Sequence, residues 1–223
     1  MPFTFTRAVA VFRIGILTIR EKWEKYLNTS ISTKTEKYLS KKFPMITESA
    51  NVLLNASFCP TKELVSLILS LKKNEAVYKE DNLIAYFSEN TQEEVDFSGY
   101  KKINFEGDLL RVKNTWDIFS KNGIALQDDF EHITRGRQSA PISSTNHLIN
   151  PENIFLEEGA RVEYSILNAT EGPIDLGKDS EDMEGNLIRG AFAVCDKAVV
   201  KMGAKFNGQT TVGPYANVGG EIR

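Results

Sequence analysis

The sequence has few of the residues that build metal centres and disulfide frameworks. Its two cysteines, Cys59 and Cys195, lie far apart and outside any Cys-x-x-Cys spacing. Such spacing implies neither a zinc site nor a disulfide framework, so we expect free, buried thiols in the reducing cytoplasm. The two histidines, His132 and His147, are read as a helix-surface residue and a linker residue rather than as catalytic bases.

The chain also lacks a marked excess of charge and a membrane-spanning hydrophobic run. Its net charge of −3 excludes a global basic field that would recruit nucleic acid. The apolar run over residues 8–19 contains Arg13 and is too short to cross a bilayer. No small-residue cleavage site of the signal-peptide kind follows it. We therefore expect a cytoplasmic globular protein with neither nucleic acid nor a membrane as a partner.

The last third of the sequence contains a six-residue period. Apolar residues occupy every sixth position except one, in the series Leu176, Asp182, Ile188, Val194, Val200, Phe206, Val212 and Val218. Small residues often stand two positions before them, and such a period is typical of a parallel β-helix. A β-sandwich with chance periodicity is the alternative, and seven apolar positions in register argue against it.

The same period predicts which side chains stack inside the β-helix. Three six-residue strands make one coil, so residues 18 positions apart lie above one another. The expected columns are Leu176, Val194 and Val212; Asp182, Val200 and Val218; and Ile188 and Phe206. Each fully buried apolar side chain contributes roughly 1.5–3 kcal/mol. We expect the β-helix to begin between Ile154 and Leu176, with an irregular first coil.

The earlier part of the chain predicts an α/β layer. Thr18 and Glu21 form a capping box that opens a helix with Ile19, Trp23 and Leu27 on one face. A strand over 51–55, a helix after Pro60-Thr61 and a hairpin over 75–78 and 83–87 follow. Helices over 114–119 and 126–133 should place Trp116, Phe119, Phe130 and Ile133 against a core.

Residues 135–145, rich in Ser, Thr, Gly and Arg, mark a domain boundary. We expect an α/β domain over 1–133, a linker over 134–150 and a β-helix over 151–223. The acids Asp128, Asp129 and Glu131 should form a solvated helix face. Arg135 and Arg137 either pair with those acids or reach a phosphate, and pairing is the simpler reading.

With these segments in view, the chain resembles the sugar nucleotidyltransferases of Bacteroidetes-type bacteria. The similarity lies in residues 3–7, 13–23, 115–119 and 143–146, and within the β-helix in 184–185, 189–190, 202–205 and 218–221. Those proteins are similar to the bifunctional N-acetylglucosamine-1-phosphate uridylyltransferase/glucosamine-1-phosphate acetyltransferase. The resemblance implies a Rossmann-like nucleotidyltransferase domain and a left-handed β-helix of the acyltransferase type, assembled as a homotrimer.

The resemblance also implies a nucleotide site. In the family, a glycine-rich loop ends in Thr-Arg and a Pro-Lys follows, and cations hold the triphosphate. Here Thr6-Arg7 matches Thr-Arg, Arg13 falls near the lysine and Lys22 lies on the following helix. Phe3–Phe5 stands where the glycines would be. Arg7 and Arg13 could instead be ordinary surface or ion-paired arginines, and the catalytic residues stay unassigned.

A metal site is less well supported by the resemblance. In the wider superfamily a strand ends in Gly-Asp, and the aspartate binds catalytic Mg²⁺. Ser57 stands near that place here and cannot supply a carboxylate, so Mg²⁺ should strengthen nucleotide binding only modestly.

Both ends depart from the family pattern. The family carries a strand before the signature loop and more coils after the last repeat, which implies a missing first strand and a truncated β-helix. Two functions remain: transfer of a nucleotidyl group to a sugar-1-phosphate, or a non-catalytic nucleotide-binding or assembly module. Acyl transfer belongs to a longer protein.

Overall fold

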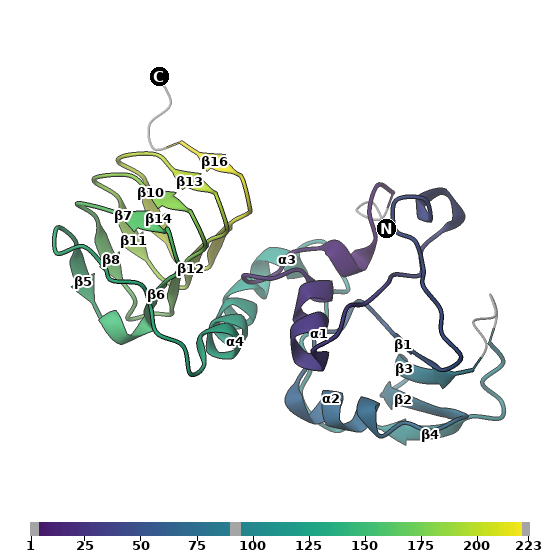
Figure 1. The fold of residues 1–223 in the computed structure, drawn as a ribbon. Helices are drawn as coiled ribbons and strands as arrows, with labels where there is room; N and C mark the ends of the chain where they lie inside the picture. The colour runs from purple at the N-terminus through teal and green to yellow at the C-terminus, as the bar shows by residue number, and fades with distance from the viewer. Residues whose placement is uncertain (1–4, 90–94, 220–223) are drawn as a thin grey trace. The chain divides into compact units, whose positions relative to one another are not determined.

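A computed structural model describes residues 5–89 and 95–219. Contacts divide the chain into two compact units, Met1–Phe12 with Thr18–Thr115 and Arg13–Leu17 with Trp116–Arg223. Figure 1 labels the helices and strands of both units. Residues 3–4 and 220–221, which contribute to the family resemblance, lie outside the described residues. The division falls earlier than the linker expected at 134–150, because the helices after Thr115 pack with the β-helix.

The first unit contains a small sheet with helices. Its elements are η2 (Val9–Val11), α1 (Ile19–Leu27), η3 (Lys37–Leu39), β1 (Asn51–Leu54), α2 (Lys62–Leu69), β2 (Glu75–Lys79), β3 (Asn82–Ser88) and β4 (Lys101–Asn104). The strand order is β1-β3-β2-β4. β3 runs antiparallel to β1 and β2, and β4 runs parallel to β2. The predicted α/β layer, strand and hairpin are confirmed, and the sheet is mixed.

Local capping explains where the two helices of this unit begin. Thr18 Oγ1 accepts the Glu21 N–H at 3.2 Å, and the Glu21 carboxylate accepts the Thr18 N–H at 2.6 Å. This is the predicted capping box. Thr61 caps α2 in the same way by accepting the Leu64 N–H at 3.2 Å. Trp23 Nε1 donates to the Phe58 carbonyl at 2.9 Å, which ties α1 to the segment after β1.

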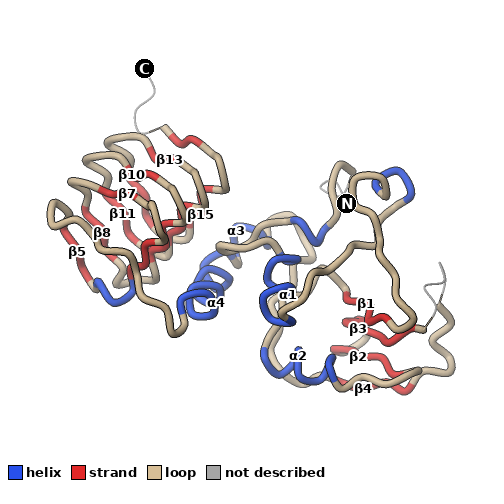
Figure 2. Tube along the Cα trace, viewed as in Figure 1, coloured by secondary structure: helices blue, strands red, loops and turns tan. Residues whose placement is uncertain are grey.

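The second unit is a parallel β-solenoid with two helices. Its elements are α3 (Asp117–Ser120), α4 (Asn122–Thr134), β5 (His147–Ile149), η4 (Pro151–Asn153), β6 (Ile154–Leu156), β7 (Arg161–Val162), β8 (Ile166–Asn168), β9 (Ile174–Leu176), β10 (Glu181–Asp182), β11 (Leu187–Arg189), β12 (Phe192–Val194), β13 (Val199–Val200), β14 (Lys205–Asn207), β15 (Thr210–Val212) and β16 (Asn217–Val218). Three four-stranded sheets form its sides, in the orders β5-β8-β11-β14, β6-β9-β12-β15 and β7-β10-β13-β16. Figure 2 shows the short strands separated by loops around each coil.

The predicted columns are confirmed. Val194 pairs with both Leu176 and Val212, and Val200 pairs with Asp182 and Val218. Ile188 pairs with Phe206 in the third sheet. The columns form a single buried core, where the rings of Phe192 and Phe206 lie 4.7 Å apart. The six-residue period therefore reports the inward-facing positions directly. The handedness implied by the resemblance stays a prediction.

The solenoid begins earlier than predicted, at His147 instead of between Ile154 and Leu176. Leu148 pairs with Leu167 in β8, so the expected linker already contains the first strand. The inward residues Leu148, Leu156 and Val162 are eight and six positions apart, and Leu167 and Leu176 are nine apart. This uneven spacing, caused by longer corners, hides the first coil from a search for sixes.

The apolar face of α4 explains why the helices join the second unit. Leu126 and Phe130 of α4 are buried against Phe155 and Ala193 on the outer face of the solenoid. Phe130 and Ile133 therefore face a core, as predicted. The same prediction for Trp116 and Phe119 is wrong, because their side chains are 58% and 72% exposed. Trp116 is the N-cap of the short helix α3 and Phe119 lies within it, and this helix is too brief to bury a face of its own.

Cys59 and Cys195 are both buried, as predicted, and neither belongs to a disulfide in the described residues. Over the described residues, the structure contains no helix with the length and hydrophobicity that a bilayer crossing requires.

Candidate functional site

Three of the four predicted nucleotide-binding residues lie in the first unit. Thr6 and Arg7 are exposed and precede η2, so their side chains are open to solvent. Lys22 lies on α1 and is only 4% exposed, so most of its side chain packs inside the unit. Arg13 belongs to the second unit. The expectation that Arg7 and Arg13 line one pocket, near Lys22 or the end of the strand over 52–54, stays a prediction.

The residues after β1 provide only neutral amide and hydroxyl oxygens at the place where the resemblance implies a Mg²⁺ ligand. Asn55 Oδ1 accepts both the backbone N–H and the hydroxyl of Ser57, at 3.1 and 2.8 Å. Asn55 Nδ2 donates to the Leu83 carbonyl at 2.9 Å. These neutral groups are engaged with each other and supply no carboxylate, which Mg²⁺ sites favour. Among the described residues, no group of three or more His, Cys, Asp or Glu could hold a metal ion. The local residues do not fit the implied site.

The structure brings Arg111 to the same place, which the sequence did not indicate. Phe58 and Arg111 form an antiparallel bridge, and Val112 N–H donates to the Ser57 carbonyl at 2.7 Å. The Arg111 guanidinium lies 4.9 Å from the centre of the Phe58 ring. Its Nη1 donates to Asn82 Oδ1 at 2.8 Å. A cation thus lies beside the loop that follows β1, and only the three-dimensional pairing reveals it.

Arg13 is the first residue of a five-residue segment, Arg13–Leu17, whose backbone N–H groups bind side chains of α4. The carboxylate of Asp129 accepts the N–H groups of Ile16 and Leu17, at 2.8 and 3.0 Å. Asn122 Oδ1 accepts the N–H of Gly15 at 2.8 Å. Asp129 is 5% exposed, so the prediction that it belongs to a solvated helix face is wrong. The Ile16 N–H that donates to its carboxylate is 113 positions away in the sequence, so no local pattern could have indicated this contact.

The solenoid holds the other side of this segment. Thr211 Oγ1 on β15 donates to the Gly15 carbonyl at 3.1 Å, and Asn122 Nδ2 donates to Thr211 Oγ1 at 3.1 Å. The Cys195 thiol contacts the Ile16 carbonyl at 3.6 Å. Arg13 Nη1 donates to that same carbonyl. The arginine is therefore tied to a backbone whose polar groups are bound by α4 and the solenoid.

Gly15 is required where it stands. Its φ is +76°, a conformation that disfavours a side chain. A Cβ there would lie 2.6 Å from both the Ala125 carbonyl oxygen and an Asp129 carboxylate oxygen. The close approach of this backbone to α4 thus depends on glycine.

Two buried carboxyl groups in the solenoid have raised pKa values. The pKa of Asp175 is raised to about 8, mainly by burial and also by the charges of Glu157, Asp196 and Asp129, while Arg137 opposes the rise. Asp175 Oδ1 finds no hydrogen-bond partner among the described residues.

Burial raises the pKa of Asp182 to about 6, against hydrogen bonds from Asn186 and Ser165. Asn186 Nδ2 donates to Asp182 Oδ1 at 2.7 Å. Both acids are buried, so they destabilise the fold when they ionise and are not exposed to bind a ligand.

Arg137 does not pair with the acids of α4, contrary to expectation. Its two terminal nitrogens bind both carboxylate oxygens of Glu157, at 2.7 and 2.5 Å. Its guanidinium also lies 5.1 Å from the centre of the Phe155 ring. Its Nη1 also donates to the Ile133 carbonyl of α4 at 3.1 Å, so the side chain joins the end of the helix to the solenoid wall.

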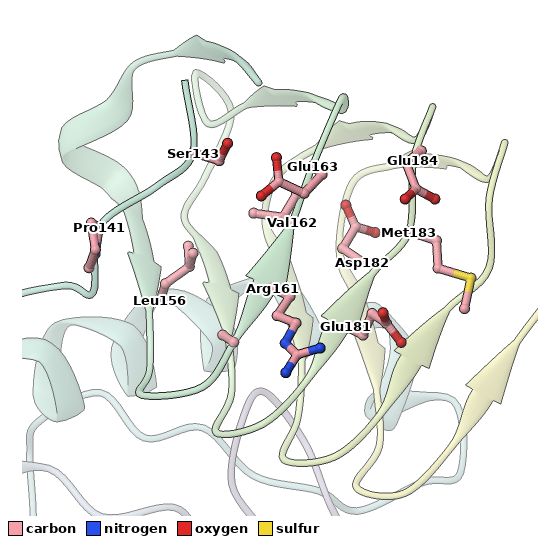
Figure 3. Close-up of a pocket in the computed structure, with 11 residues that line it drawn as sticks. Pro141, Ser143, Leu156, Arg161, Val162, Glu163, Glu181, Asp182, Met183 and Glu184 are labelled. Carbon is pink, nitrogen blue, oxygen red and sulfur yellow. The ribbon is translucent and has the colours of Figure 1, made fainter. Parts of the chain in front are cut away.

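Two cavities lie elsewhere. One, of about 190 Å³, is formed by the first coils of the solenoid (Figure 3) and is lined by Pro141, Ser143, Leu156, Ala160, Arg161, Val162, Glu163, Glu181, Asp182, Met183 and Glu184. Arg161 and Glu181 lie side by side there on β7 and β10. The other, of about 540 Å³, lies at the β2–β3 hairpin and includes Tyr78, Lys79 and Lys102. Neither is lined by the predicted nucleotide-binding residues, and the first is below the usual size of a ligand pocket, roughly 300–1,000 Å³.

Comparison with known proteins identifies the family. No curated protein matches the chain. A family model described as sugar nucleotidyl transferase matches residues 1–138, which is 138 of the 223 residues. The match spans the first unit, the Arg13–Leu17 segment and α4, and ends before the first strand of the solenoid. The chain therefore belongs to the sugar nucleotidyl transferase family.

Proposed function

We propose that this protein transfers a nucleotidyl group from a nucleoside triphosphate to a sugar-1-phosphate, giving a nucleotide sugar and pyrophosphate. The family match over residues 1–138 carries the proposal. Thr6, Arg7, Arg13 and Lys22 are the proposed nucleotide-binding residues. Cations and backbone donors stabilise the negative charge that develops on a transferring phosphoryl group, and arginine suits phosphate because it donates in a fork.

A non-catalytic nucleotide-binding or assembly module is the second candidate. The observation that favours it is Ser57, which stands near the place of a metal-binding carboxylate and whose hydroxyl donates to Asn55. Arg111 lies beside this loop and supplies a fixed positive charge. Under this proposal nucleotide binds by cations alone, and Mg²⁺ strengthens binding only modestly.

Pyrophosphate release separates the two candidates. The chain is incubated with a panel of nucleoside triphosphates and sugar-1-phosphates, and calorimetry measures binding of uridine and thymidine triphosphates with and without Mg²⁺. Release that requires a sugar-1-phosphate supports the transferase. Binding without release supports the module, and no binding contradicts both.

Arg13→Ala tests the proposed nucleotide site. It should weaken binding by roughly 1.5–3 kcal/mol, the worth of a hydrogen bond to a charged group. Arg20→Ala is the matched control, because Arg20 lies on α1 with its Nε 3.8 Å from Glu24 and its side chain is 37% exposed. Equal loss in both variants would contradict a specific role for Arg13.

We further propose a cytoplasmic homotrimer assembled through the solenoid, as the resemblance to the bifunctional acetyltransferase/uridylyltransferase implies. Three apolar side chains on the outer face of β5-β8-β11 support self-association: Ile149, Ile166 and Leu187 are 44%, 41% and 42% exposed. Sedimentation equilibrium should detect an oligomer that Leu187→Glu dissociates. A wild-type monomer would contradict this assembly.

A further inference from the structure

The segment that carries Arg13 has its backbone polar groups bound mainly by side chains from distant parts of the chain. Gly15 N–H, Ile16 N–H and Leu17 N–H are bound by Asn122 and Asp129. The Gly15 carbonyl is bound by Thr211. Buried backbone groups are costly when left unpaired, so these partners decide the shape of the segment.

The bonds form a continuous chain from the solenoid to the arginine. Thr211, on β15, contacts both Gly15 and Asn122, and Asn122 Nδ2 also donates to the Gln209 carbonyl at 3.0 Å. The segment's shape sets the direction of the Ile16 carbonyl. Arg13 donates to that carbonyl, so the guanidinium is oriented by a group that α4 and β15 fix.

Apolar packing reinforces the bonds. Ile16 is 7% exposed and packs with Leu126 and Phe130 of α4 and with Phe155 and Ala193 of the solenoid. The shape of the Arg13–Leu17 segment is therefore fixed by α4 together with the outer wall of the solenoid, to which Thr211 of the fourth coil belongs.

We propose that Asn122, Asp129 and Thr211 are positioning residues for nucleotide binding by Arg13, which lies in the same unit. This inference rests on the proposed function. The three residues act through the Arg13–Leu17 backbone and touch no substrate themselves.

Thr211→Val tests the proposal most sharply, because it exchanges a hydroxyl for a methyl group of similar size. Calorimetry with uridine and thymidine triphosphates should show binding weakened roughly three- to thirtyfold, the range of indirect coupling effects. Thr211→Ser keeps the hydroxyl and should restore binding. Asp129→Leu should weaken binding in the same way, and Asp129→Asn, which keeps an acceptor oxygen, should recover part of it.

Two controls separate positioning from stability. Thr210→Val removes a neighbouring hydroxyl that donates to the Gly208 carbonyl and should leave affinity unchanged. Val200→Ala opens a cavity in the solenoid core, where Val200 is fully buried; it should lower the melting temperature without changing affinity. If an Asp129 variant fails to fold, the Thr211 pair decides.

The outcomes distinguish the two proposals. If wild-type protein binds either nucleotide and Thr211→Val binds equally well, the positioning inference is overturned and the proposed function stands. If Val200→Ala weakens binding as much as Thr211→Val at equal loss of stability, the role is structural only, which also overturns it. If wild-type protein binds no nucleotide, both fail.

Discussion

Asp175→Asn should stabilise the protein at neutral pH. Asp175 lies on β9 in register with Phe155 and Ala193, both buried beneath α4. Its pKa is raised from 3.8 to about 8 in the folded state. A folded acid with a raised pKa stabilises the fold only while it is protonated. Stability is therefore lost as the pH rises from about 4 to 8, because the folded state holds a proton that the unfolded state has released.

The size of the effect follows from the pH interval. In the unfolded state the carboxyl has its ordinary pKa of 3.8, so pH 7 lies about three units above that pKa. Each unit is worth about 1.36 kcal/mol. The cost is thus about 4 kcal/mol, and asparagine, which does not ionise, removes it. Its amide adds buried donors, which cost about 1–3 kcal/mol. The net gain at pH 7 should be about 1–3 kcal/mol, and at pH 4 the variant should be the less stable.

Urea unfolding at pH 4, 5, 6, 7 and 8 measures this prediction. The wild-type free energy of unfolding should fall with pH more steeply than that of Asp175→Asn. Asp179→Asn, which removes an exposed carboxylate from the same coil, is the control and should keep the wild-type slope. Parallel pH profiles for wild type and Asp175→Asn would refute the reasoning, because the buried carboxyl would then not be the group that titrates.

Three further substitutions test other features of the fold. Asp182→Val completes the column between Val162 and Val200 and removes an acid whose pKa is raised to about 6; after the lost bond to Asn186 is counted, urea unfolding at pH 8 should show a gain of about 1–2 kcal/mol, with no gain at pH 4. Gly15→Ala should cost about 1–3 kcal/mol, seen as a lower melting temperature, because of its positive φ and the contact with α4. Thr18→Ala should cost about 1 kcal/mol by removing the cap of α1, and Thr18→Ser should recover most of it; no change in either would contradict the assigned contacts.

The solenoid was predictable because its core is periodic. Each strand of a coil contributes one inward position at a fixed spacing. The apolar residues from Leu176 to Val218 therefore indicate which side chains stack on one another in successive coils. Asp182 kept the period although it is acidic, and the structure buries it at its expected place. The first coil was not predicted because the corners around Asn150 and 169–173 change the spacing between successive inward residues. Periodicity reveals the interior only where the corners have equal length.

The candidate site was predictable only in part, because its contacts join residues far apart in the chain. The Thr18–Glu21 cap is local and was foreseen. Asp129, by contrast, sits in an acidic stretch that looks solvated, and its partners lie near the N-terminus. Arg111 gave no signal at all, since only strand pairing brings it to Phe58. The role of Arg13 in nucleotide binding stays a prediction, and sequence reasoning missed the groups that hold its segment.

The bond between Thr211 and Gly15 has a consequence for the order of events during protein synthesis. The two residues are 196 positions apart. At about 5–20 residues per second, the ribosome needs roughly 10 to 40 s to travel from one to the other. Each solenoid coil can form as soon as its neighbour emerges, because Val194 needs only Leu176 and Val212. The arginine-bearing segment is made first and must wait for Thr211, so its backbone gains this partner only after most of the solenoid has been synthesised.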